Sequence, residues 1–269
     1  IFTAPDGTVT IEEIKTTALS ADAITGEQSP EHWAQGQVYA FIYGVQQNLP
    51  RLCVQLTYYQ VDEELTLQFS HTYTIQQLTE FVTGLLEQYA PWARRAASWR
   101  EQRVASLAGM QFPFEGFRPG QKAMLREVYQ VCTRGGQLLC QAPTGIGKTI
   151  SVLFPALKAV GEGGPVFYLT ARGTTRTAAE QALAAVHGAN PGLTLRSITL
   201  TAKDKICLCE TRECTPEACP YANGYFDRIK QALWRALDET SLTAETLQKL
   251  AGQYTVCPFE LGLDASLWC

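Results

Sequence analysis

The sequence lacks the long apolar runs and leader patterns that direct a chain to a membrane. Its 269 residues contain no run of roughly 18 consecutive apolar residues, the length that a membrane-spanning helix needs. The first residues do not combine a charged segment with a following apolar one, as a secretory signal would. We therefore expect a cytoplasmic protein that does not enter a membrane.

Histidine and paired cysteine motifs are also scarce. The three histidines, His32, His71 and His187, show no ligand-like spacing, and we assign them no chemistry. No Cys-x-x-Cys pair is present, although a zinc site built from cysteines usually contains two such pairs. In a cytoplasmic chain, nine cysteines do not indicate a disulfide framework. Where thiols cluster, metal ligation is the favoured interpretation.

What is present is typical of a packed globular chain, with 46% apolar and 18% charged residues. The net charge of -4 hides an uneven distribution. Acidic residues dominate residues 1–90, whereas residues 94–134 are rich in arginine. We therefore place a domain boundary near residue 91 and predict a helical linker over residues 91–110, with Pro91 at its start. Its arginines form either a solvated face or a stripe that contacts phosphate.

The most specific motif lies in residues 137–149, "QLLCQAPTGIGKT", where an apolar strand-like run leads through a small-residue loop into a helix. Backbone N–H groups of such a loop and of the helix N-terminus surround anionic phosphates. In this motif Lys148 would reach the β- and γ-phosphates and Thr149 would hold Mg²⁺, although Ala142 stands where the motif has glycine. The predicted ATP-binding residues are Ala142, Pro143, Thr144, Gly145, Ile146, Gly147, Lys148 and Thr149.

Alternating strand and helix patterns follow this loop. "PVFYLT" (165–170) and "LTLRSITL" (193–200) are strand-like, and "TTRTAAEQALAAV" (174–186) between them is helix-like. Strands that alternate with helices of this length indicate an α/β fold with a parallel, doubly wound sheet.

Four features in this order resemble the first motor domain of XPD/DinG-type superfamily 2 DNA helicases. They are "FEGFRPGQ" (114–121), "APTGIGKT" (142–149), "YLTARGTTRT" (168–177) and the cysteine cluster. The resemblance covers roughly residues 110–269 and implies a RecA-like parallel sheet. It also implies that Arg118 and Gln121 lie near the nucleotide base. No acidic Walker B segment and no second motor domain are visible, so we expect a truncated motor with little ATP turnover by itself.

The cysteine cluster "KICLCETRECTPEACP" (205–220) lies where these helicases carry an iron–sulfur insertion. A 4Fe-4S cluster takes four thiolates. The candidates are Cys207, Cys209, Cys214, Cys219 and Cys257, and we choose Cys207, Cys214, Cys219 and Cys257 as ligands. Cys209 is the substitute ligand, and we expect its side chain to point away from the cluster. Zinc and thiols without metal remain the alternatives.

The N-terminal region carries a second candidate site. In "PDGTVTIEEIKTT" strand alternation places Glu13 and Lys15 on one face, where a carboxylate for Mg²⁺ and an ammonium for a scissile phosphate would meet. In the following helix, "SPEHWAQGQVYAFIY", Gln35 and Tyr39 lie one turn apart. The combination resembles RecB-like nucleases of the PD-(D/E)xK type, whose further metal-binding aspartate we expect before Ile1. The next two strand-like runs predict a hairpin across Asp62 and Glu63.

These patterns together predict four regions. They are a partial restriction-endonuclease-like α/β domain at 1–90, a helical linker at 91–110, the first part of a P-loop motor domain at 111–202, and a truncated, cysteine-rich helical Fe–S insertion at 203–269.

The expected function is that of an ATP-dependent DNA helicase fragment, which couples ATP hydrolysis to DNA unwinding in repair or recombination. Its cofactors would be ATP, Mg²⁺ and a 4Fe-4S cluster, and its partner would be single-stranded or forked DNA. The alternatives are a metal-dependent DNA nuclease with an accessory helicase-like part, and a non-enzymatic, metal-stabilised DNA-binding module.

Overall fold

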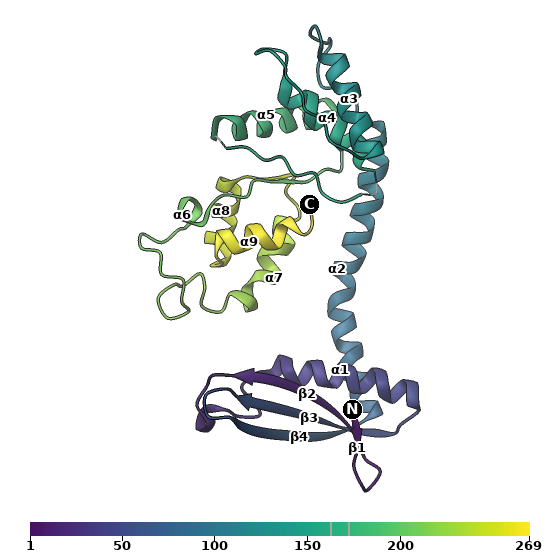
Figure 1. The fold of residues 1–269 in the computed structure, drawn as a ribbon, viewed down its shortest axis with the longest axis vertical. Coiled ribbons are helices and arrows are strands. Elements are labelled where there is room, and N and C mark those ends of the chain that lie inside the picture. Colours follow the sequence, from purple (N-terminus) through teal and green to yellow (C-terminus); the bar gives the residue numbers. More distant parts are fainter. Residues whose placement is uncertain (162, 172) are drawn as a thin grey trace. The chain divides into compact units, whose positions relative to one another are not determined.

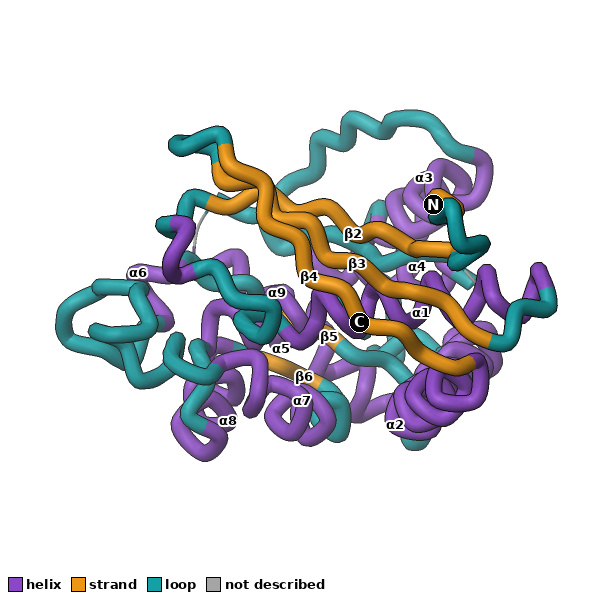
Figure 2. The backbone as a smooth tube through the Cα atoms, turned by 90° about the horizontal axis from the view of Figure 1, so that it is seen from below, coloured by secondary structure: helices purple, strands orange, loops and turns teal. Residues whose placement is uncertain are grey.

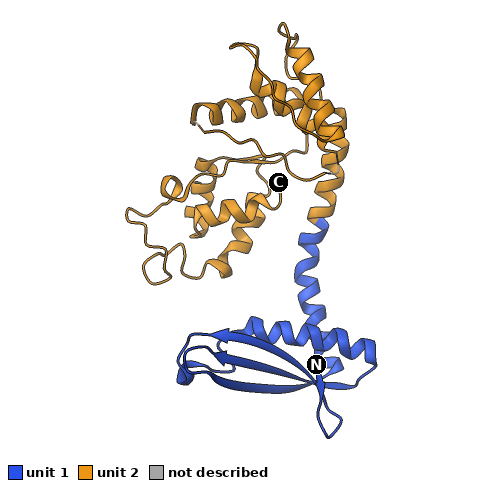
Figure 3. Ribbon diagram, viewed as in Figure 1, with its two compact units in different colours: residues 1–94 blue, residues 95–269 orange. Residues whose placement is uncertain are grey.

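The computed structural model describes residues 1–161, 163–171 and 173–269 (Figure 1). It divides into two compact units, Ile1–Arg94 and Arg95–Cys269 (Figure 3). Arg172 of the 168–177 motif lies outside the described residues.

The first unit is built on a four-stranded sheet with the order β1-β2-β3-β4. The strands are β1 (Phe2–Thr3), β2 (Val9–Thr17), β3 (Arg51–Gln60) and β4 (Leu65–Thr74), and Figure 2 shows β2, β3 and β4 side by side. Strands β2 and β3 are parallel, so they need a crossover, which the 3-10 helix η1 (Ala21–Ala23) and the helix α1 (Pro30–Gln47) provide. Strands β3 and β4 pair antiparallel, which confirms the predicted hairpin.

Helix α1 packs closely on one face of this sheet because two of its buried residues are glycines. A Cβ atom at Gly36 would lie 2.5 Å from a methyl group of Val54, and one at Gly44 would lie 2.7 Å from a methyl group of Leu52. The core between helix and sheet buries Ile11, Ile24, Trp33, Ala40, Leu52, Val54, Leu56, Tyr58 and Leu78. The strand alternation that buries Ile11 also directs Glu13 and Lys15 to this face.

Helix α2 spans Ile75–Gly109 and contains Pro91 in its interior. The helix start that we expected at Pro91 is therefore absent, and the division between the two units falls inside this helix. Proline removes one backbone hydrogen bond from a helix interior. The flanking alanine, leucine, glutamine and arginine residues are strong helix formers, which explains why the helix continues past that loss.

The second unit is mainly helical. Its elements are α3 (Gln121–Arg134), α4 (Lys148–Val160), α5 (Gly173–Ala189), α6 (Lys203–Ile206), α7 (Tyr225–Ala236), α8 (Ala244–Tyr254) and α9 (Pro258–Ser266), with the parallel pair β5 (Ser197–Ile198) and β6 (Ser241–Leu242). One core, which includes Leu107, Ile150 and Val186, joins α2, α4 and α5. Another, which includes Leu242, Leu247 and Leu261, joins the helices of the cysteine-rich region.

Two of the three strand-like runs of this unit are not strands in the structure. Residues 137–142 and 165–170 have no regular secondary structure. Leu139 is 100% exposed and Leu169 is 88% exposed, although parallel strands normally bury such side chains on both faces. Among the described residues no strand lies between Thr74 and Ser197, so the RecA-like sheet stays a prediction.

Candidate functional site

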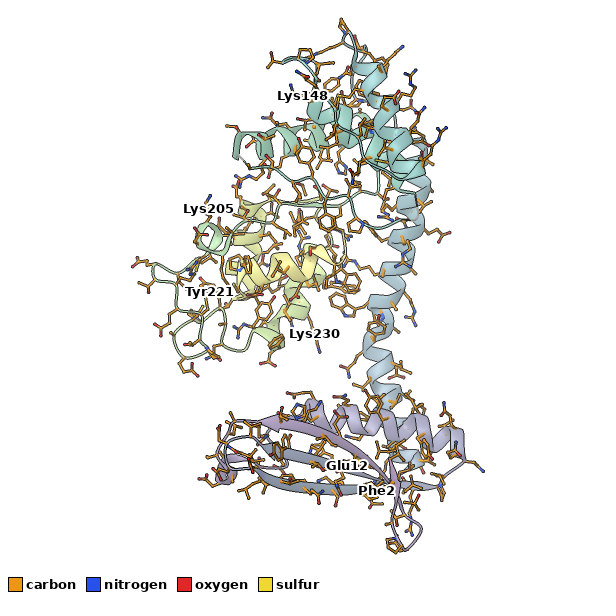
Figure 4. All side chains as sticks on the ribbon, in the orientation of Figure 1. Phe2, Glu12, Lys148, Lys205, Tyr221 and Lys230 are labelled. Atoms are coloured by element: carbon orange, nitrogen blue, oxygen red, sulfur yellow. The ribbon has the colours of Figure 1, made fainter. Side chains whose placement is uncertain are left out.

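The phosphate-loop segment leads directly into α4, whose first residue is Lys148 (Figure 4). Gly145 and Gly147 have φ angles of 84° and 81°, which glycine adopts readily. Gly147 is the N-cap residue, so the free N–H groups at the start of α4 belong to the residues of the predicted loop. The loop geometry therefore suits an anion at the helix N-terminus.

The Lys148 ammonium lies over its own loop. Its Nζ atom donates to the carbonyl oxygens of Ala142 at 3.2 Å and Pro143 at 3.0 Å. Thr149 follows in the first turn and is half-buried. A phosphate in the loop would replace two neutral carbonyl acceptors with a charged one, which forms a stronger hydrogen bond with an ammonium.

The segment around Gln121 docks onto this loop. Arg118 donates through Nη1 to the carbonyl oxygen of Gly145. Gln121 is buried and accepts from the backbone N–H of Arg118 at 3.1 Å. A Cβ atom at Gly147 would lie 2.8 Å from Gln121 Nε2, so the glycine permits this close approach. The structure thus brings the segment with Arg118 and Gln121, which the resemblance places near the nucleotide base, into contact with the predicted phosphate-binding loop.

An aromatic cluster lies beside these motifs, and our sequence reasoning missed it. The rings of Phe112 and Phe117 stack with centroids 4.7 Å apart, and Lys122 Nζ lies 4.9 Å from the Phe117 ring centroid. Phe114 and Phe154 also contact Phe112. The close spacing of phenylalanines in "QFPFEGF" was the available signal.

The cysteine-rich segment brings Cys209 to Cys219, with the two sulfur atoms 3.9 Å apart. Partial burial, followed by the neighbouring thiols of Cys219 and Cys207, raises the pKa of Cys209 to about 11. Cys209 therefore does not point away from the other thiols, contrary to our expectation. Cys214 is exposed, and Cys257 is the N-cap residue of α9.

Lys203 lies beside the remaining thiols. A hydrogen bond from its ammonium to Glu260, with Nζ 2.7 Å from Oε1, is the main cause that raises the pKa of Lys203, and Cys214 and Cys257 add to this effect. Burial raises the pKa of Cys257. In the part of the chain that the structure describes, no group of three or more Cys, His, Asp or Glu side chains is arranged to hold a metal. The four-thiolate site therefore stays a prediction.

The four nuclease-like residues form one chain of contacts between β2 and α1. Lys15 Nζ lies 2.7 Å from Glu13 Oε1 and donates to Gln35 Oε1 at 3.0 Å. Gln35 Nε2 in turn donates to the hydroxyl of Tyr39 at 3.2 Å. The periodicity of each element predicted that Glu13 and Lys15 share a strand face and that Gln35 and Tyr39 share a helix face. The contact between Lys15 and Gln35 comes from the packing of α1 on the sheet.

Two neighbours of this group were not predicted. Tyr58 lies opposite Lys15 in the β2–β3 register, and burial raises its pKa. The Tyr58 hydroxyl lies 2.8 Å from Nδ1 of His32, to which we had assigned no chemistry. Glu12, by contrast, accepts from Thr57 at 2.6 Å and from Gln55 at 3.1 Å (Figure 4 labels Glu12). Because successive strand residues face opposite sides of the sheet, the Glu12 side chain lies on the other face from Glu13.

Comparison with known proteins gives a local similarity. Over 47 residues the chain is 40% identical to a probable ATP-dependent helicase of Methanocaldococcus jannaschii. This chain is similar in part to a helicase. The matched stretch covers 18% of this chain and 7% of the archaeal protein. No protein-family model and no solved structure matches the chain. Among the described residues, none of the helices has the length and apolar character to cross a membrane.

Proposed function

We propose that this chain is part of an ATP-dependent DNA helicase and that ATP binds at residues 142–149. The observation that carries the proposal is the contact between two motifs far apart in sequence. Arg118 and Gln121 lie against the loop that ends in Gly147 and Lys148. The local similarity to an archaeal helicase supports the same class of protein.

In this proposal each residue has a physical role. The loop N–H groups and the N-terminus of α4 attract the phosphates, and Lys148 exchanges its two carbonyl contacts for phosphate oxygens. Mg²⁺ bound by Thr149 would offset the charge that develops during phosphoryl transfer. Arg118 and Gln121 would border the base, because they lie next to Gly145 and Gly147 at the edge of the loop.

The test is DNA-stimulated ATP hydrolysis by the whole protein that contains this chain. Lys148→Ala removes the ammonium beside the phosphates, and we expect turnover to fall by about 100-fold or more. Lys249→Ala is the matched control, because Lys249 is an exposed lysine of α8. Turnover that is unchanged in Lys148→Ala, with circular dichroism like the wild type, would contradict the proposed motor.

We extend the proposal to a 4Fe-4S cluster held by four of the five cysteines between Cys207 and Cys257. Our first ligand set is Cys207, Cys214, Cys219 and Cys257. The 3.9 Å contact between Cys209 and Cys219 supports Cys209 as the substitute ligand. The test is iron per chain after anaerobic purification, for Cys209→Ser and Cys257→Ser. Loss of iron in Cys257→Ser alone supports the first set, loss in Cys209→Ser alone supports a compact local set, and zinc without iron excludes the cluster.

A second candidate function is Mg²⁺-dependent DNA cleavage by the first unit. The observation that favours it is the chain of contacts from Glu13 through Lys15 and Gln35 to Tyr39. We expect Glu13→Gln to abolish cleavage and Glu12→Gln to retain it, because the Glu12 carboxylate contacts Thr57 and Gln55 instead. Equal cleavage by both variants would exclude Glu13 as a metal ligand.

A further inference from the structure

A cavity of about 380 Å³ lies within the second unit, beside the C-terminal part of α2. Its lining includes four arginines and two tryptophans, namely Arg95, Arg100, Arg103, Arg196, Trp99 and Trp268. Its described lining contains no aspartate or glutamate. Cations in a concave, partly water-excluded wall concentrate positive potential inside it. The cavity is therefore suited to an anion.

The arginines are held in place mainly by backbone carbonyl groups rather than by carboxylates. Arg103 Nη2 donates to the carbonyl oxygen of Gly163 at 2.7 Å, and Arg196 Nη2 donates to that of Leu237 at 2.9 Å. Arg95 has a carboxylate partner, Asp238, with its Nη2 atom 2.6 Å from Oδ1. The described residues thus supply one ion-pair partner for this group of four cations.

Arg103 is the most informative member of the group. Its residue is 7% exposed, and its Nε atom has no hydrogen-bond partner among the described residues. Burial, followed by repulsion from Arg100, lowers its pKa. A buried charged donor without a partner is unfavourable, and an anion in the cavity would offset the repulsion between Arg103 and Arg100.

Trp99 adds an aromatic surface to this charged wall. The Cζ atom of Arg196 lies 4.7 Å from the Trp99 ring centroid, and that of Arg103 lies 5.3 Å from it. Two guanidinium groups are thereby fixed around one indole, which reduces the side-chain freedom that a bound ligand would otherwise have to remove. Guanidinium forks match phosphate oxygens, and indole rings stack with nucleic-acid bases.

We propose that this cavity binds a phosphate group of a nucleic-acid strand, with Arg100, Arg103 and Arg196 as its donors. The inference deepens the proposed helicase function by naming where a strand is held. It can fail independently of that function, because strand binding here needs neither ATP nor Lys148. The cavity volume is within the range of roughly 300–1,000 Å³ that small-ligand sites occupy, so it admits a nucleotide unit and not a duplex.

The test is a fluorescence-anisotropy titration of labelled oligothymidylate, without ATP, at several salt concentrations. Arg100→Gln is the main variant, because Arg100 is exposed and its loss should leave the fold intact. We expect binding to weaken about threefold to tenfold and the salt dependence to fall by about one phosphate contact. The matched control is Arg126→Gln, whose arginine lies on α3 beside Glu127, outside the cavity lining, and should bind like the wild type.

A second variant and a competitor complete the test. Arg103→Lys keeps the charge but removes the guanidinium fork, and it should also weaken binding with unchanged circular dichroism. Wild-type affinity in both Arg100→Gln and Arg103→Lys would overturn the proposal, as would a site that binds thymidine monophosphate but not the strand. Lys148→Ala should bind the strand normally, so an inactive motor and an absent strand site give different results.

Discussion

Strand-like segments form paired strands throughout the first unit, whereas two of the three such segments in the second unit form no strand. In the first, all four strands pair, and Leu52, Leu56 and Tyr58 are almost completely buried. In the second, the apolar segments 137–142 and 165–170 form no strand, and Leu139 and Leu169 face solvent. Apolar content and β propensity alone therefore did not decide where a sheet formed.

The difference lies in how close in sequence the pairing partners are. Strands β3 and β4 are joined by residues 61–64, so their pairing closes a very short loop. The parallel pair β2 and β3 is joined through α1, which also covers the sheet. A parallel strand near the phosphate loop would need neighbours from more distant segments and cover on both faces. The sequence of residues 137–142 by itself supplies neither the neighbouring strands nor the helices that would cover the two faces.

The largest expected effect tests the core of the first unit. Leu56→Ala removes a fully buried side chain from the sheet and leaves a cavity beneath α1. We expect the free energy of unfolding to fall by about 3 kcal/mol. Urea unfolding followed by circular dichroism measures it, and a loss below about 1 kcal/mol would show that this sheet is less well packed than its burial indicates.

The next test compares two helix glycines of the first unit. A Cβ atom at Gly36 would collide with Val54, so Gly36→Ala should destabilise by about 2 kcal/mol through overpacking. Gly84 lies in α2 with nothing within 4 Å of its Cβ position, so Gly84→Ala should stabilise by about 0.5–1 kcal/mol. Thermal unfolding measures both changes. Equal shifts would contradict the close packing of α1 on the sheet.

A smaller effect concerns a helix end in the second unit. The Thr243 hydroxyl caps α8 by accepting from the backbone N–H of Thr246 at 3.3 Å. Thr243→Ala leaves this N–H without its partner, and we expect a loss of about 1 kcal/mol. Thr243→Ser keeps the hydroxyl and serves as the control. Hydrogen exchange of the α8 amides reports whether the loss is local to this helix.

The smallest expected effect tests directly whether residues 137–142 of the second unit are exposed, in contrast to the buried strands of the first unit. Leu139→Ala removes a fully exposed side chain, so the free energy of unfolding should change by less than about 0.5 kcal/mol. The single variant Leu56→Ala, measured under the same conditions, serves as the comparison. A loss for Leu139→Ala as large as that for Leu56→Ala would mean that residues 137–142 are buried in solution and belong to a sheet after all.

Several features followed from the sequence because each depends on the periodicity or chemistry of one element. Strand alternation placed Glu13 and Lys15 on the same face, and helical spacing placed Gln35 and Tyr39 one turn apart. The small-residue loop predicted a helix directly after it, and α4 begins there at Lys148. The hairpin was predictable because its turn is short and both its strands carry strand-forming residues.

The tertiary structure alone decided the features that join distant segments. It continued α2 through Pro91, brought Cys209 to Cys219, and placed Arg196 beside Arg103 around Trp99. The physical reason is that periodicity reports which face of its own element a residue occupies, whereas its neighbour across a cavity is set by how elements pack. Arg103 read alone is a solvated helix residue, and only the packing shows it buried without a partner for Nε among the described residues.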